Sequence, residues 1–147
     1  MMASFNAFGE YPPRMIIFPG ERIRDVGLSE FPYTIYSTTP NGWMDSAAFL
    51  EYVKQIDAIV DNKGIRKPII LFVDGHSAHI CLETSQYCKD RNIILYCLLP
   101  NATHLLQAAN IGLFAPLKSS WVPAVKAWQM ENVGMAVWYV PLRREWN

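Results

Sequence analysis

The chain has 147 residues, of which 51% are hydrophobic and 18% are charged, and thirteen basic residues balance thirteen acidic ones. This composition is that of one folded domain, because a disordered chain needs low hydrophobicity and high net charge. Zero net charge excludes a whole-surface attraction to DNA or to anionic lipid, and no stretch reaches the roughly 20 apolar residues of a membrane span.

The first half of the chain predicts three strands and one helix. Segments 3–8 and 14–18 are short, apolar and aromatic, and the two prolines in the loop between them favour a strand–loop–strand unit. Residues 33–37 alternate as a strand does. Asp45 or Ser46 then begins a helix whose apolar residues recur every three or four positions as far as the NKG turn.

The second half alternates between strands and helices. The continuous apolar run 69–73 and the segment 92–99, which is apolar after Asn92, predict strands buried on both faces of a layered α/β sheet. A helix is predicted over 77–91 between them. A turn or short helix at 103–109 leads to a helical stretch over about 112–132, which its internal prolines are expected to kink or divide. The predicted fold class is therefore α/β, in the order β-β-β-α-β-α-β-α-α.

Asp74 is the sharpest candidate for a functional residue. It follows directly after the apolar run 69–73, at the carboxyl end of a predicted central strand, where open α/β sheets present ligand-binding groups. A carboxylate there, followed by Gly75, suits a hard cation such as Mg²⁺. The alternative is a turn aspartate, because Asp-Gly is a common turn pair.

Histidines lie close to Asp74 in the sequence. His76 and His79 begin the predicted helix after it, and we expect them to support Asp74 through hydrogen bonds and charge. A zinc site built with His104 and Cys81 is a weaker alternative, because the paired spacings of structural zinc sites are missing. A Ser–His or Cys–His nucleophile pair is also a weaker alternative, because no nucleophile-elbow motif is present.

Basic and aromatic residues alternate near the end of the chain. No Asp or Glu occurs between Arg91 and Met130, whereas Lys118 and Lys126 lie within that interval and two tryptophans lie near them. This pattern is compatible with contacts to a phosphate backbone. The favoured alternative is an amphipathic helix with its tryptophans in the core and its lysines in water.

Several motifs together resemble the DDE superfamily endonuclease domain of pogo-type transposases, the group that includes Tigger- and jerky-derived proteins. The resemblance runs from about residue 3 to 132 and is most specific in its last two blocks. It rests on the segments NAFGE (6–10) with its following prolines, GWMDS (42–46), DGHSAH (74–79), LPNATHLLQ (99–107) and GLFAPLK (112–118).

The resemblance implies an RNase H-like mixed sheet flanked by helices, over a partial domain at residues 1–132 with a divergent tail at 133–147. It implies Mg²⁺-dependent cutting of DNA, in which three carboxylates hold two ions. Asp74 is similar to the second carboxylate, and Asn110 occupies the position of the third. Supporting positions carried over from the motifs are His76, His79, His104 and Gln107.

Two departures from the family pattern predict that the chain does not cleave DNA. The first strand of the family's sheet, which carries the first carboxylate, is expected to be missing at the N-terminus. At the third position Asn110 brings no charge, and no acidic neighbour replaces it. Two divalent ions about 4 Å apart repel by roughly 17 kcal/mol at an effective dielectric of 20, so a single carboxylate is not expected to hold both.

The predicted function is a nuclear, transposase-derived domain with local DNA binding through Lys118 and Lys126, and without productive Mg²⁺ binding. The missing strand is expected to expose the flank of the sheet, including Ile70 and Phe72. Either a partner chain then covers this flank, or the sheet rearranges, or the fold is only marginally stable. Two alternatives stay open. One is a domesticated protein-interaction module, and the other is a nuclease subunit completed by carboxylates of another chain.

Overall fold

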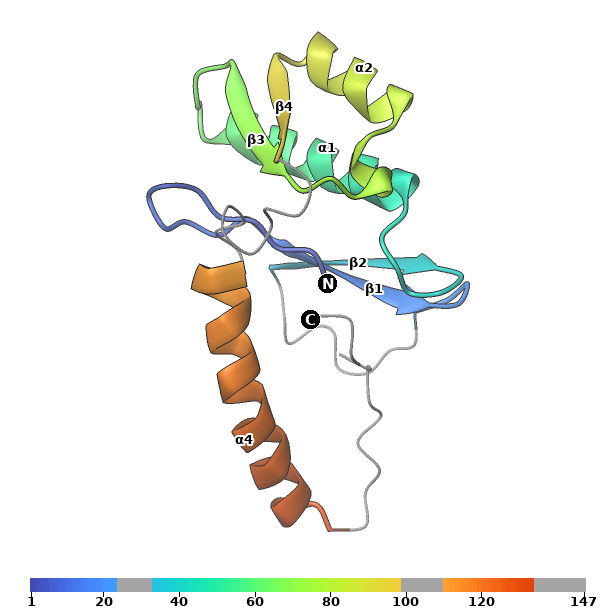
Figure 1. The fold of residues 1–147 in the computed structure, drawn as a ribbon, viewed down its shortest axis with the longest axis vertical. Helices are drawn as coiled ribbons and strands as arrows, with labels where there is room; N and C mark the ends of the chain where they lie inside the picture. Colours follow the sequence, from blue (N-terminus) through green and yellow to red (C-terminus); the bar gives the residue numbers. More distant parts are fainter. Residues whose placement is uncertain (24–32, 99–109, 134–147) are drawn as a thin grey trace. The chain divides into compact units, whose positions relative to one another are not determined.

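The computed structural model describes residues 1–23, 33–98 and 110–133. Contacts between residues divide the chain into two units, 1–109 and 110–147, and each unit is described by itself. The elements, labelled in Figure 1, are β1 (Arg14–Pro19), β2 (Thr34–Thr39), α1 (Ser46–Asn62), β3 (Ile69–Val73), the 3₁₀ turn η2 (Ser77–His79), α2 (Leu82–Asp90), β4 (Ile93–Cys97), the π-helical turn η3 (Asn110–Phe114) and α4 (Ala115–Glu131).

The first unit contains two sheets of two parallel strands. β1 pairs with β2, with Arg14 opposite Thr34, and β3 pairs with β4, with Ile69 opposite Ile93. Parallel strands need a crossover connection, and α2 lies in the chain between β3 and β4. The predicted α/β class is thus confirmed as a mixed α/β arrangement with short sheets.

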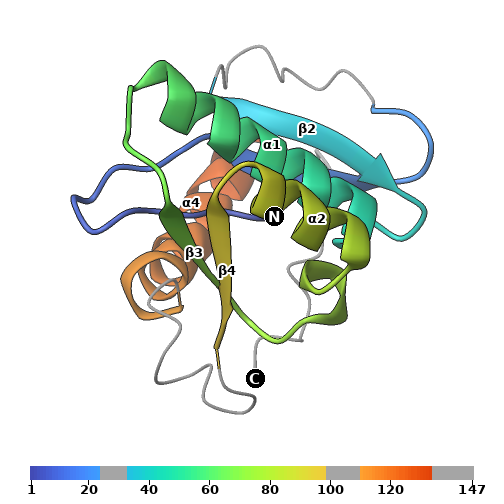
Figure 2. The same cartoon turned by 90° about the horizontal axis from the view of Figure 1, so that it is seen from above.

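Helix α1 packs against both sheets and holds the core together. It begins where the Asp45 carboxylate accepts a hydrogen bond from the Ala48 N–H at 2.8 Å, as the capping pattern predicted. Met15 of β1 belongs to one buried cluster with α1. Val73 of β3 belongs to a second cluster, with Phe49 of α1 and residues of α2 and β4. In both Figure 1 and Figure 2, α1 lies beside each of the two sheets.

The prediction that the two apolar strands are buried on both faces is wrong. Alternate side chains of β3 and β4 are exposed in cross-strand pairs: Ile70 (55%) opposite Ile94 (47%), and Phe72 (63%) opposite Tyr96 (55%). Among the residues described in the first unit, both α1 and α2 pack on the other face. The exposure of Ile70 and Phe72 therefore belongs to the face of the sheet and not to its flank, because side chains stand above and below a sheet.

The predicted strand at 3–8 does not form. Instead Met2 makes one antiparallel bridge with Met15, with hydrogen bonds of 2.7 and 2.8 Å between their main-chain groups. The Asn6 carboxamide oxygen accepts hydrogen bonds from the N–H groups of Phe8 and Glu10. Such side-chain contacts satisfy the backbone N–H groups in a turn, so the segment does not need a strand partner. This explains why residues 3–8 do not form the predicted strand.

Two helix predictions also need correction. The segment 77–91 forms η2 and then α2, because the Cys81 thiol accepts a hydrogen bond from the Thr84 N–H and so caps a new helix. Helix α4 is continuous through Pro123, so the expected division into two helices is wrong, whereas the kink stays a prediction. Pro116 lies in the first turn of α4, where the missing N–H costs nothing. The prediction at 103–109 lies outside the described residues. No helix in the described ranges is long and apolar enough to cross a membrane.

Candidate functional site at the end of β3

Asp74 lies where the sequence predicted it, directly after the carboxyl end of β3. The neighbouring strand β4 ends on the same side, because the Leu98 N–H donates to the Val73 carbonyl at 2.8 Å. The Cys97 thiol lies 3.7 Å from the main-chain oxygen of Asp74. Asp74 therefore occupies the edge where parallel strands present ligand-binding side chains.

His79 is the closest side-chain partner of Asp74. Its Nδ1 lies 2.7 Å from Asp74 Oδ1, at hydrogen-bonding distance but away from the direction of a well-aligned hydrogen bond. The imidazole packs on the ring of Phe49, with 4.4 Å between ring centroids, and Phe49 is completely buried on α1. The helix α1 thus positions His79, and His79 in turn supports Asp74.

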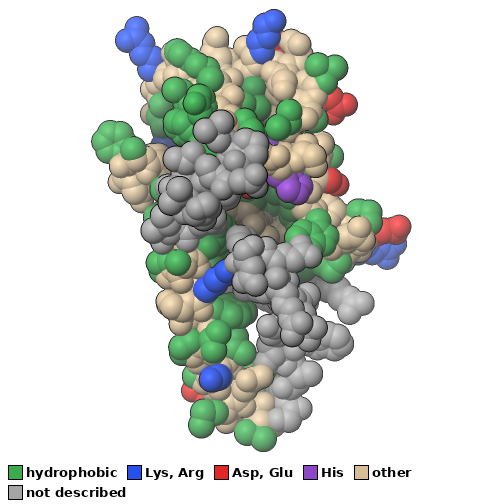
Figure 3. All heavy atoms as spheres, in the orientation of Figure 1, with side chains coloured by type: hydrophobic (Ala, Val, Ile, Leu, Met, Phe, Trp, Pro, Cys, Tyr) green, Lys and Arg blue, Asp and Glu red, His purple; other side chains and the backbone are tan. Residues whose placement is uncertain are grey.

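His76 contributes through its backbone. Its N–H donates to Asp74 Oδ1 at 3.2 Å, while its own Nδ1 accepts from the Ala78 N–H at 3.2 Å. The rings of His76 and His79 lie 5.5 Å apart, and histidine side chains reach the molecular surface in Figure 3. Both histidines therefore lie beside Asp74, where the sequence predicted support.

The surroundings of Asp74 favour its ionised form. The imidazole of His79 lowers the pKa of the Asp74 carboxyl, partial burial opposes that effect, and the His76 N–H lowers the pKa further. The net shift is downward from 3.8. With its side chain 29% exposed, Asp74 is a carboxylate that is charged at neutral pH and accessible to a ligand.

The described residues do not fit a pair of Mg²⁺ ions. In the ranges that the structure describes, no group of three or more His, Cys, Asp or Glu side chains is arranged to hold a metal. The groups around Asp74 are imidazoles, whereas Mg²⁺ prefers oxygen ligands. His104 and Gln107 lie outside the described residues, and so does the side chain of Asn110, whose backbone begins η3.

The predicted basic and aromatic residues of α4 do not share one face. At 3.6 residues per turn, Lys118 lies about 60° from Trp121 around the helix axis, but Lys126 lies about 160° from Trp128. The two tryptophans are 44% and 40% exposed, so the favoured interpretation that they are core residues is wrong. Residues that alternate along the sequence are thus separated around the helix.

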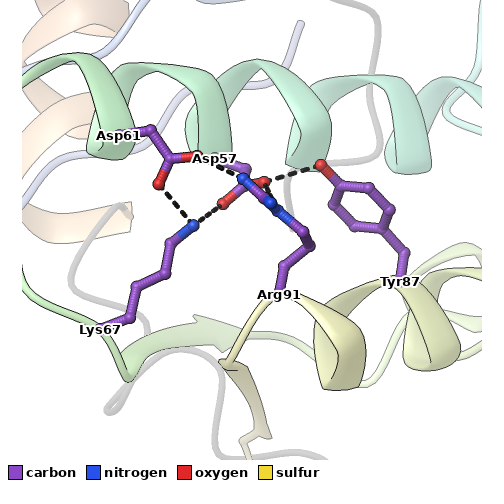
Figure 4. A network of polar contacts seen from close by, with 5 residues as sticks. All are labelled: Asp57, Asp61, Lys67, Tyr87 and Arg91. Carbon is purple, nitrogen blue, oxygen red and sulfur yellow. Dashed lines mark hydrogen bonds and ion pairs between the residues drawn. The ribbon is translucent and has the colours of Figure 1, made fainter.

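Sequence reasoning missed a polar network centred on Asp57, which is only 2% exposed. Lys67 Nζ lies 2.5 Å from Asp57 Oδ1, Arg91 Nε donates to Asp57 Oδ2 at 2.6 Å, and the Tyr87 hydroxyl donates to the same oxygen at 2.8 Å. Both basic groups also pair with Asp61 (Figure 4). The network joins α1 to α2 and to the segment before β3.

The network keeps Asp57 charged despite its burial. Burial raises the pKa of the Asp57 carboxyl, but the hydrogen bonds from Lys67, Arg91 and Tyr87 together outweigh burial, so the pKa falls below 3.8. A signal was present in the sequence, because Asp57 lies within the apolar stripe of α1, between Val53 and Val60. A charge on a buried helix face requires partners.

The geometry defines an α/β domain with an ionised carboxylate at the carboxyl end of a parallel strand. The family model for the DDE superfamily endonuclease matches residues 1–134. The chain therefore belongs to the DDE superfamily endonuclease family, which confirms the resemblance at that level.

The comparisons also give a partial relative. The chain is 31% identical over 129 residues to the MFS-type transporter clz9 of Cochliobolus lunatus. The matched stretch covers 86% of this chain and 14% of that protein. The chain thus spans about one seventh of the length of the curated relative it matches. No solved structure matches.

Proposed function

We propose that this chain is a transposase-derived, pogo-type domain with an RNase H-like fold that binds DNA and does not cleave it by itself. The observation that carries the proposal is the match of the DDE endonuclease family over residues 1–134, which includes the ionised Asp74 at the end of β3. The proposal includes a nuclear location, because chromosomal DNA would be the ligand of such a domain.

The lack of cleavage follows from the carboxylates. In this proposal Asp74 acts as the second metal ligand of a family whose members depend on Mg²⁺, because its DGHSAH segment (74–79) resembles the family's motif. Asn110 stands at the third position, and its amide oxygen carries no charge to offset a divalent ion. We assign none of these 147 residues to the first carboxylate, so the proposed lack of cleavage applies to this stretch of chain by itself.

We expect no nicking of supercoiled DNA by the chain, with Mg²⁺ or Mn²⁺ and equally after their removal by EDTA. Asn110→Asp is expected to remain inactive, because one added carboxylate still leaves the first missing. Asp74→Ala serves as the matched control on an agarose-gel assay. Metal-dependent nicking that disappears in Asp74→Ala would instead support a nuclease subunit, and activity in Asn110→Asp alone would contradict the proposal.

Binding to DNA is expected to weaken as salt rises, because lysine contacts to phosphates release counterions. Lys118→Ala and Lys126→Ala are each expected to reduce the slope of log affinity against log salt by about 1. Fluorescence anisotropy with a 30-base-pair duplex at several salt concentrations measures the affinity and its salt slope for the wild type and for each variant. Arg66→Ala, in the exposed segment before β3, is the matched control and should leave the slope unchanged. An affinity independent of salt would favour the protein-interaction module.

A further inference from the structure

In the part of the chain that the structure describes, the outer edge of β4 carries main-chain groups without a neighbouring strand. Within the described residues β4 pairs with β3 alone. In a parallel ladder, alternate residues direct both their N–H and C=O groups to the same neighbour. Because Ile69 donates to the Asn92 carbonyl, even-numbered positions face β3. The main-chain groups of Ile93, Leu95 and Cys97 therefore point away from β3, to the outer edge.

The residues of β4 itself lack the features that usually protect an edge strand. Native proteins discourage strand pairing with charged residues, prolines, bulges or very short edges. The β4 sequence IILYC contains no charge, no proline and no glycine, and its register with β3 is regular over all five residues. The backbone is thus suited to pairing with another extended chain.

A groove of about 480 Å³ opens beside the same edge. Ser85 and Lys89 of α2 line one side of it, and Ile93 and Leu95 of β4 line the other. In both Figure 1 and Figure 2, β4 lies between β3 and α2. Lys89 is the one charged residue among those that line the groove, so the groove favours a ligand with a negative charge at that point.

We propose that the outer edge of β4 binds an extended segment of another protein as an added β-strand. Such a segment hydrogen-bonds to the main chain of Leu95 and Cys97, and its side chains alternate between two sides. On one side they are apolar, beside the exposed Tyr96 and beside Ile94, which also reaches the rim of the groove. On the other side they face the groove, where an acidic residue pairs with Lys89.

Hydrogen exchange followed by NMR tests the main-chain contacts. The probe is an eight-residue peptide of alternating valine and threonine with one glutamate near its end. Exchange of the Leu95 and Cys97 amides is expected to slow at least tenfold when the peptide is added, whereas that of Ile94, already directed to β3, stays unchanged. The same peptide with N-methylated alternate residues is the control and should protect neither amide. Unchanged exchange at Leu95 and Cys97 would overturn the proposal.

Charge reversal tests the acidic partner. Lys89→Glu is expected to weaken binding of the glutamate peptide about fivefold, and a peptide with lysine in that position should restore it. Arg66→Glu makes the same change of charge outside the groove and should have no such effect. An equal loss of peptide affinity in Lys89→Glu and Arg66→Glu would contradict the role of Lys89. If the Leu95 and Cys97 amides slow without peptide as protein concentration rises, the edge pairs with a second copy, and the assignment to a different protein is wrong.

Discussion

Replacing Asp57 with alanine is expected to lower the free energy of unfolding by about 3 kcal/mol. Breaking a buried ion pair typically costs about 3–5 kcal/mol, because the remaining charges lose their partner. The cost here falls at the lower end because Lys67 and Arg91 both keep Asp61. Urea unfolding followed by circular dichroism measures the change. Asp61→Ala, whose side chain is 46% exposed, is the matched control and should cost about 1 kcal/mol or less.

The same network predicts how stability depends on pH. The pKa of Asp57 is lower in the folded chain than its ordinary 3.8, so its contribution is complete above that value. The contribution is lost as the pH falls through the lower, folded pKa. The difference in unfolding free energy between the wild type and Asp57→Ala should therefore narrow below pH 4. A constant difference between pH 7 and pH 2 would contradict the role of the charged form.

Replacing Phe49 with alanine is expected to cost about 4 kcal/mol, which is typical of a buried Phe→Ala change. Phe49 is completely buried in the cluster that joins α1 to β3, α2 and β4. Phe72→Ala is a matched control with the same chemistry, and it should cost about 1 kcal/mol or less because Phe72 is exposed on the other face. Thermal unfolding of the two variants compares them, and equal losses would place Phe49 outside the core.

The Phe49 variant also tests how the site is held. Its ring supports the His79 imidazole, so its removal should shift the His79 Cε1–H resonance and loosen the contact with Asp74. Phe49→Leu fills most of the space, so it should restore most of the stability. It should not restore the position of the His79 resonance, because leucine has no ring to shield the imidazole. An unchanged His79 resonance in Phe49→Ala would contradict this support.

Local signals explain which elements could be predicted. Asp45 and the apolar spacing after it specify α1, because the cap and the helical period both act within a few residues. The apolar runs likewise predicted β3 and β4. The strand expected at 3–8 does not form, because the Asn6 side chain accepts hydrogen bonds from the N–H groups of Phe8 and Glu10 and holds a turn. That competition depends on geometry that an apolar pattern does not encode.

The candidate site was only partly predictable. Asp74 and its two histidines lie within six consecutive residues, so one motif brought them together. The support from Phe49 was missed because Phe49 and His79 are 30 positions apart in the sequence. On α4, the lysines and tryptophans looked like one patch, but the helical period separates Lys126 from Trp128 by about 160°.

The sequence by itself determined the family, the main helix, the apolar strands and the position of the acidic residue after β3, because each depends on residues close together in the chain. Only the tertiary structure decided which face of the β3–β4 sheet is covered. It also decided that a buried Asp57 is paired with Lys67 and Arg91. Coverage and charge pairing are set by residues that meet after folding, so no local pattern specifies them.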